Sequence, residues 1–185
     1  METPELLVVD ATAWRQWLNE HWNRSSGVWL VLAKKGTTEP TSLSYDQALE
    51  EALCFGWIDS QLAKRDAATF QQRFTPRTSR SPWSMRNTSL IAELLAQGRM
   101  HEAGIREVER ARADGRWDAA YAGQSTIEVP DDLAIALAAN PEAAERFKTL
   151  KRSDRYSILF RLSQAKRPET RARHIERAIA ALSSP

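Results

Sequence analysis

The sequence predicts an α+β protein with a small antiparallel sheet of about three strands packed with helices, followed by an all-helical C-terminal module. Apolar residues recur at helical spacing as far as Cys54 and then alternate along residues 57–77. After "GQSTIEVP" (residues 123–130) only helical patterns follow. We therefore expect an α+β domain over residues 1–122 and a helical module over residues 130–185.

The α+β domain is expected to begin with a helix, a strand and a second helix. Residues 13–22, "AWRQWLNEHW", place tryptophans and a leucine on one face at helical spacing. Residues 28–36, "VWLVLAKKG", carry β-branched and aromatic residues in both parities, which is typical of a strand covered on both faces. Ser44 and Gln47 form a capping box for the second helix, and Gly56 stands where a left-handed terminator belongs.

Residues 57–64 and 69–77 flank the tetrapeptide "RDAA" and are expected to form an antiparallel hairpin. One register separates an apolar face from a polar face, and a slip of one residue would destroy this separation. The pairs in that register are Ile58 with Phe74, Leu62 with Phe70, Gln61 with Gln71, and Asp59 with Arg73. The sequence therefore predicts a cross-strand ion pair at the first half of the hairpin.

The rest of the chain is expected to be helical. Ser84 can cap a helix over residues 85–97, and another helix over residues 101–114 ends before Gly115. In the C-terminal module, the expected helix starts are Pro130, Asn140-Pro141, a Ser153 cap, and Pro168. The last helix should place Ala172, Ile175, Ala178, Ile179 and Leu182 on one side.

Composition is that of a soluble globular protein. The 185 residues are 42% hydrophobic and 27% charged, and no apolar run approaches the length of a membrane span. The N-terminus, "METPELLVVD", is acidic and unlike a signal peptide. A single cysteine, Cys54, excludes an internal disulfide and suits a reducing compartment, so we expect a cytoplasmic location.

The formal net charge of +2 conceals an asymmetry along the chain. Residues 146–185 hold 11 Lys/Arg and 3 Asp/Glu, a net of +8, whereas residues 1–145 hold 15 and 21, a net of −6. Either the two segments dock on one another or the basic end meets an acidic partner. The basic tail carries no nucleic-acid-binding motif, so nucleic acid is not an expected partner.

The stretch from Arg73 to Arg86, "RFTPRTSRSPWSMR", combines four arginines with hydroxyl groups and a tryptophan. Arginine forks and the start of a capped helix are suited to binding an oxyanion. One interpretation is a pocket for a small anion. Its expected residues are Trp57, Asp59, Arg73, Arg77, Trp83, Ser84, Asn87 and Lys35. The alternative is that Asp59 and Arg73 form a structural pair and the loop is simply solvated.

Catalytic residues are not assigned by the sequence. No histidine lies near Asp59 in the chain, and Cys54 is expected to be buried and inert beside Leu53 and Phe55. The three histidines stand alone, without a second ligand at helical spacing, and no phosphate-binding loop occurs. We therefore expect no metal and no cofactor.

Several blocks of the sequence resemble a known family. They are "EEALCFGWIDSQ", "RFTPRTSRSPWSMRN", "ADGRWDAAY" and "AKRPETRARHIERAIAAL". Together they resemble the YdeI/OmpD-associated, or bacteriocin-protection, family over nearly the whole chain. The tail from about Asp131 to Leu182 is similar to that family's helical module. Its recurring motif is represented here by Phe147, Lys166, Glu169, Thr170, Arg171 and Arg173.

This resemblance implies a bacterial role in envelope stress or in tolerance of bacteriocins, and it brings no catalytic residues. Combined with the residue patterns, it makes a non-enzymatic protein that binds a small anion or a peptide acid the main hypothesis. A hydrolase-like enzyme using Asp59 is one alternative. The other is a nucleic-acid or protein interaction module that acts through the basic C-terminal helices.

Overall fold

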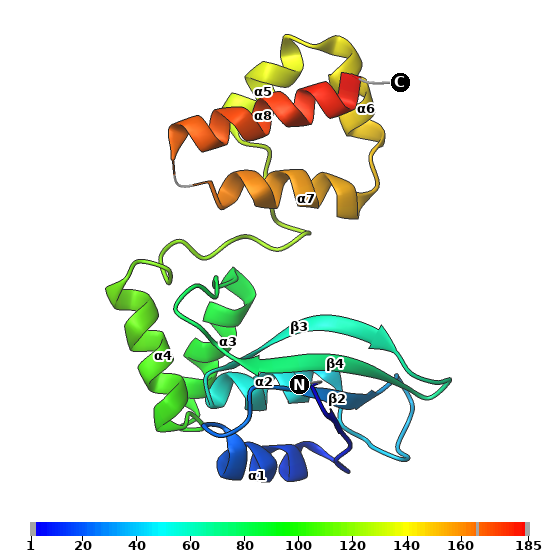
Figure 1. Ribbon diagram of the computed structural model, residues 1–185, viewed down its shortest axis with the longest axis vertical. Helices are drawn as coiled ribbons and strands as arrows, with labels where there is room; N and C mark the ends of the chain where they lie inside the picture. The colour runs from blue at the N-terminus through cyan, green and yellow to red at the C-terminus, as the bar shows by residue number, and fades with distance from the viewer. Residues whose placement is uncertain (1–2, 166, 184–185) are drawn as a thin grey trace. The chain divides into compact units, whose positions relative to one another are not determined.

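The computed structural model describes residues 3–165 and 167–183, and it divides the chain into two compact units, Met1–Ala120 and Tyr121–Pro185. The first unit contains every described strand and four helices, and the second is helical (Figure 1). The expected α+β class with a helical C-terminal region is therefore confirmed. Each unit has its own cluster of buried apolar residues, so each is described separately below.

The sheet of the first unit has four strands, in the order β1-β2-β4-β3. Their bounds are β1 Glu5–Leu6, β2 Val28–Ala33, β3 Trp57–Lys64 and β4 Thr69–Pro76. The expected antiparallel pairing holds for β2, β3 and β4, but β1 lies parallel to β2, so the sheet is mixed. The sequence missed β1 because a strand of two residues is too short to show alternation.

The register of the β3–β4 hairpin differs from the predicted one. Asp59 lies opposite Phe74, and Lys64 lies opposite Phe70, with a shift in register between Asp59 and Leu62. Arg73 pairs instead with Trp29 of β2. Because neighbouring residues of a strand point to opposite faces, Asp59 and Arg73 lie on different faces of the sheet. The predicted ion pair between them is therefore wrong.

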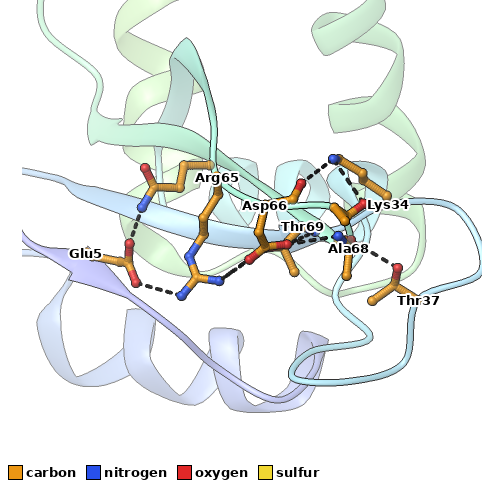
Figure 2. Close-up of polar contacts among 9 residues, drawn as sticks. Glu5, Lys34, Thr37, Arg65, Asp66, Ala68 and Thr69 are labelled. Atoms are coloured by element: carbon orange, nitrogen blue, oxygen red, sulfur yellow. Dashed lines mark hydrogen bonds and ion pairs between the residues drawn. The ribbon is translucent and has the colours of Figure 1, made fainter.

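The tip of the hairpin explains the different register. Asp66 Oδ1 accepts hydrogen bonds from the backbone N–H of Ala68 (2.9 Å) and of Thr69 (2.7 Å), and the Thr69 hydroxyl donates to Oδ2 (2.8 Å). Figure 2 shows these bonds together with Arg65, whose guanidinium bridges Asp66 and Glu5 of β1. The hydrogen bonds of the Asp66 side chain close this turn and determine which residues pair at the tip. The alternation of apolar residues does not predict such a turn.

Four helices complete the first unit: α1 Ala11–His21, α2 Tyr45–Cys54, α3 Met85–Ala96 and α4 Glu102–Ala113. The Ser44–Gln47 capping box, the Ser84 cap of α3 and the left-handed Gly56 (φ +73°) occur as predicted. Helices α1 and α2 pack on one face of the sheet, where Trp14, Leu18, Leu30 and Phe74 are fully buried.

The second unit consists of α5 Asp131–Ala138, α6 Pro141–Thr149, α7 Arg152–Ser163 and α8 Pro168–Ser183. Pro141 and Pro168 open helices as predicted. Helix α7 begins at Arg152, so Ser153 lies inside the helix, and the prediction that it is a cap is wrong. On α8, Ile175, Ile179 and Leu182 belong to the core, whereas Ala172 is exposed, so it does not extend the apolar side of that helix.

Candidate functional site

A cavity in the first unit lies where α2 ends and β3 begins. The left-handed conformation of Gly56 turns the chain between these two elements. Helix α4 approaches the same turn closely, because the backbone N–H of His101 donates to the Cys54 carbonyl (3.0 Å) and Gly104 packs against that carbonyl. The turn and α4 together form two walls of the cavity.

This cavity has a volume of about 270 Å³, near the lower end for ligand pockets. Its aromatic lining residues are Trp22, which follows α1, and Phe55 and Trp57, which flank Gly56 at the α2–β3 turn. Polar groups come from three places in the chain: the segment after α1, the end of β4, and α4. The polar side chains lining the cavity are Asn23, Ser25, Arg77, Arg106 and Glu107. The space is thus an aromatic recess whose lining includes two arginines and one glutamate.

Arg77 is held in a fixed position beside this cavity. Only 6% of the residue is exposed, and its guanidinium carbon lies 3.6 Å from the centroid of the Trp83 ring. Its Nη1 donates to the Pro82 carbonyl (3.0 Å), and its backbone N–H donates to the carbonyl of Gly56 (2.9 Å). The structure therefore brings Arg77, Trp83 and Trp57, three of the predicted site residues, to one end of the sheet.

Arg106 and Glu107 of α4 also line the cavity, and neither was among the predicted site residues. The Arg106 side chain is largely exposed, with its guanidinium carbon 5.5 Å from the Trp22 ring and Nη1 3.5 Å from Glu102. Glu107 is ion-paired with Arg110, which offsets its charge within the same helix. No local sequence pattern marks this pair, since α4 carries many charges and only tertiary packing selects which of them face the cavity.

Three other predicted residues lie elsewhere. The Tyr45 hydroxyl donates to Asp59 Oδ2 (2.9 Å), and burial, together with the Asp59 charge, raises the pKa of Tyr45. Arg73 is half-buried, and its Nε has no hydrogen-bond partner among the described residues. Lys35 is exposed beyond the end of β2, near the hairpin tip. The eight residues of β4 lie between that tip and Arg77 and span about 26 Å, so Lys35 is far from the cavity.

Ser84 and Asn87, the remaining two predicted residues, have a structural role at the start of α3. The Ser84 hydroxyl accepts a hydrogen bond from the Asn87 backbone N–H (3.1 Å), as an N-cap does. Asn87 is 7% exposed. Neither residue lines the cavity beside Arg77, so the predicted eight-residue pocket separates into several parts.

A partly buried ion-pair cluster forms around Glu51 near the end of α2. Glu51 accepts hydrogen bonds from Arg15 Nη1 (2.5 Å) and Arg99 Nη2 (2.6 Å), and Arg15 Nη2 donates to the Arg99 carbonyl (2.8 Å). Cys54, fully buried beside this cluster, has a pKa raised first by burial and then by the Glu51 charge. The thiol is therefore protonated and inaccessible, which makes it unsuited to nucleophilic chemistry.

In the second unit, Arg171 joins three segments. Its Nε and Nη2 donate to the two oxygens of Asp132 at the start of α5 (2.6 and 3.0 Å), and its Nη1 donates to the Leu162 carbonyl of α7 (2.7 Å). The central arginine of the Lys-x-x-Glu-Thr-Arg motif is thus a structural clamp. Lys166, the first residue of this motif, lies outside the described residues.

The charge asymmetry along the chain also changes once the true units are known. The first unit holds 15 Lys/Arg and 16 Asp/Glu, a net of −1, and the second holds 11 and 8, a net of +3. Acids of α5 and α6 pair with bases of the same unit, as in Asp132–Arg171 and Glu145–Lys148. Part of the predicted docking between acidic and basic segments therefore takes place inside the second unit.

Among the described residues, no group of three or more His, Cys, Asp or Glu side chains is placed to hold a metal ion. Within the same residues, no helix has both the length and the apolar character needed to cross a bilayer.

The structure thus defines an α+β domain with a small aromatic and basic cavity, joined to a helical module. The first domain matches a family model over residues 6–107, and the chain belongs to this family, described as Domain of unknown function (DUF8412). The C-terminal module matches the model of a second family, described as Bacteriocin-protection, YdeI or OmpD-Associated, over residues 126–184. No curated protein and no solved structure shows a significant match to the chain.

The expected relationship to the YdeI/OmpD-associated family is confirmed, and its extent is now defined. The match covers the C-terminal module, while the blocks quoted from residues 50–61 and 73–87 fall within the other family model. The two models lie on either side of the boundary between the structural units.

Proposed function

We propose that the first unit binds a small organic anion, or the carboxylate of a peptide acid, in the cavity at the α2–β3 turn. The observation that carries this proposal is the convergence of Arg77 and Arg106, from separate elements, on one aromatic recess of about 270 Å³. Charge-assisted hydrogen bonds from guanidinium groups favour carboxylates and phosphates. Two arginines and one glutamate line the cavity, so its lining carries a formal net charge of +1.

The two arginines would have different tasks. Arg77 is fixed by Trp83 and by its bond to Pro82, so it offers a preorganised positive group at the back of the cavity. Arg106 is exposed, so it can move from Glu102 onto a bound anion without unpacking the core. The indole walls suit a ligand with an apolar body as well as an anionic head.

The test is a thermal-shift screen of carboxylates, phosphates, free amino acids and dipeptides, followed by calorimetric titration. All seven tryptophans of the chain precede residue 121, so tryptophan fluorescence reports unfolding of the first unit alone. A ligand present at a hundred times its Kd should stabilise that unit by about 2.7 kcal/mol.

Arg106→Gln should abolish the shift, because it removes the cation that can close on the ligand. Arg112→Gln lies on the same helix, removes the same charge and does not line the cavity, so it should leave the shift unchanged. Arg73→Gln, on β4 and outside the cavity lining, is a second control. If no compound stabilises the wild type more than it stabilises Arg106→Gln, the proposed site is wrong.

The description of the matched C-terminal family supports a further part of the proposal, namely that the protein contributes to tolerance of bacteriocins. We also propose a cytoplasmic location, which the single, unpaired and buried Cys54 supports. Survival of cells lacking the protein, complemented with wild type or with Arg106→Gln, would test whether the cavity serves that role.

A further inference from the structure

Two hollows lie along the seam between α7 and α8 of the second unit. One has a volume of about 560 Å³ and the other about 350 Å³. Ser157, Arg161 and His174 line both of them, so the hollows are neighbours that meet at these three side chains. We call the combined feature the α7–α8 groove.

The groove follows one stripe of each helix. On α8 its lining includes Thr170, His174, Ala178 and Ala181, which recur every three or four residues. Helix α8 has 16 residues, and its lining residues run along most of that length, so the groove extends for roughly 20 Å. This length suits a peptide segment better than a metabolite.

The groove combines an apolar floor with a basic rim. Ile158, Ala178 and Leu182 belong to the floor, and the rim arginines are Arg161, Arg167 and Arg177. None of these three arginines forms an ion pair with another residue in the described part of the chain, whereas Arg171 is engaged by Asp132 and by the Leu162 carbonyl. Asp154 is the one acidic residue that lines either hollow.

His174 adds a directional polar group between the hollows. Its Nδ1 is buried and has no hydrogen-bond partner among the described residues. The tautomer that avoids burying an unsatisfied N–H at Nδ1 carries its hydrogen on Nε2. His174 then supplies an N–H donor, as the neighbouring arginines also do. The centre of the groove therefore favours a ligand with a hydrogen-bond acceptor such as a carboxylate.

From this charge complementarity we propose that the α7–α8 groove binds an acidic amphipathic helix of a partner protein. Apolar side chains of the partner would fill the two hollows, and its carboxylates would meet Arg161, Arg177 and His174. This is the helix-in-groove mode of recognition, with anchors at helical spacing. The inference is independent of the proposed anion cavity, because it involves only the second unit.

The probe is a fluorescein-labelled helical peptide of about 16 residues, built from leucine, alanine and glutamate with leucines at helical spacing. Fluorescence anisotropy with the full chain should show saturable binding. A peptide of the same composition with its leucines out of phase should bind about tenfold more weakly, because its apolar side chains cannot enter both hollows.

Matched variants locate the binding site. Arg177→Gln should weaken binding about fivefold, while Arg173→Gln, one turn away on α8 and outside the groove, should leave it unchanged. Ala181→Phe should fill the smaller hollow and weaken binding without changing charge. Ala172→Phe is its exposed control on the same helix.

Five results would overturn the proposal. They are no saturable binding by the wild type, equal binding to the Arg177→Gln and Arg173→Gln variants, and equal binding of the in-phase and out-of-phase peptides. The fourth is displacement of the peptide by a single-stranded oligonucleotide at lower concentration, which would assign the groove to nucleic acid. Sedimentation equilibrium completes the test, because self-association lost in Ala181→Phe would assign the groove to a second copy of the chain.

Discussion

Replacing Gly104 with alanine tests the packing that forms the anion cavity. A Cβ at this position would lie 2.2 Å from the carbonyl oxygen of Cys54, and Cβ atoms essentially never approach another atom closer than 3.0 Å. Helix α4 and the end of α2 must therefore separate by about 0.8 Å or more, and the obstacle is backbone that cannot rotate away.

Two opposing effects determine the size of the change. Alanine is favoured over glycine inside a helix by about 1 kcal/mol. Overpacking of a close contact costs about 1–3 kcal/mol, and the short distance here places the variant at the upper end. The first unit should therefore lose about 1–2 kcal/mol of unfolding free energy, although the same substitution in an open helix would stabilise the protein.

Urea unfolding followed by tryptophan fluorescence measures this change, because the tryptophans all belong to the first unit. Ala92→Gly, at an exposed position of α3, calibrates the helix-propensity effect alone. Ligand-induced stabilisation should also weaken in Gly104→Ala, since the Arg106 wall of the cavity moves. A variant as stable as the wild type, or more stable, would refute the close approach of α4 to Cys54.

Three further predictions concern charged groups. Hydrogen bonds from Thr69 lower the pKa of Asp66 to about 2, so its stabilising effect is present above the unfolded pKa of about 4 and is lost as pH falls toward 2. Asp66→Asn should therefore flatten the stability profile between pH 4 and 2, measured by fluorescence melting. Glu51→Gln should cost the first unit about 1–3 kcal/mol in urea unfolding, because Arg15 and Arg99 lose their shared acceptor but remain partly exposed. Arg171→Gln should destabilise the second unit by about 1–2 kcal/mol, which would appear as faster hydrogen exchange in α5 and α8. Unfolding of the first unit, followed by tryptophan fluorescence, should not change. An equal effect of Arg173→Gln would contradict the role of Arg171 in joining the helices.

The local features of the fold were predictable because their determinants are close in sequence. The capping box at Ser44, the terminator at Gly56 and the prolines that start α6 and α8 each act within one helical turn. The boundaries and types of the long elements follow from these signals together with apolar periodicity.

The register and the cavity depended on interactions that sequence patterns do not record. Asp66 closes the hairpin tip through three hydrogen bonds, and the strand irregularity between Asp59 and Leu62 shifts the pairing again. Arg77 was found through its local cluster of arginines. Arg106 was missed, because it reaches the cavity only through the packing of Gly104 on the distant Cys54 carbonyl.

Each unit buries an apolar cluster that draws on its own residues, and the two matched family models fall on either side of Ala120. A segment with its own core can be duplicated, or moved to another protein by gene fusion, without unfolding the domain to which it was joined. The helical module therefore has the physical properties of an independent domain that can be combined with other domains. In that case, mutations that adapt the cavity to a new ligand would leave the module's own stability intact.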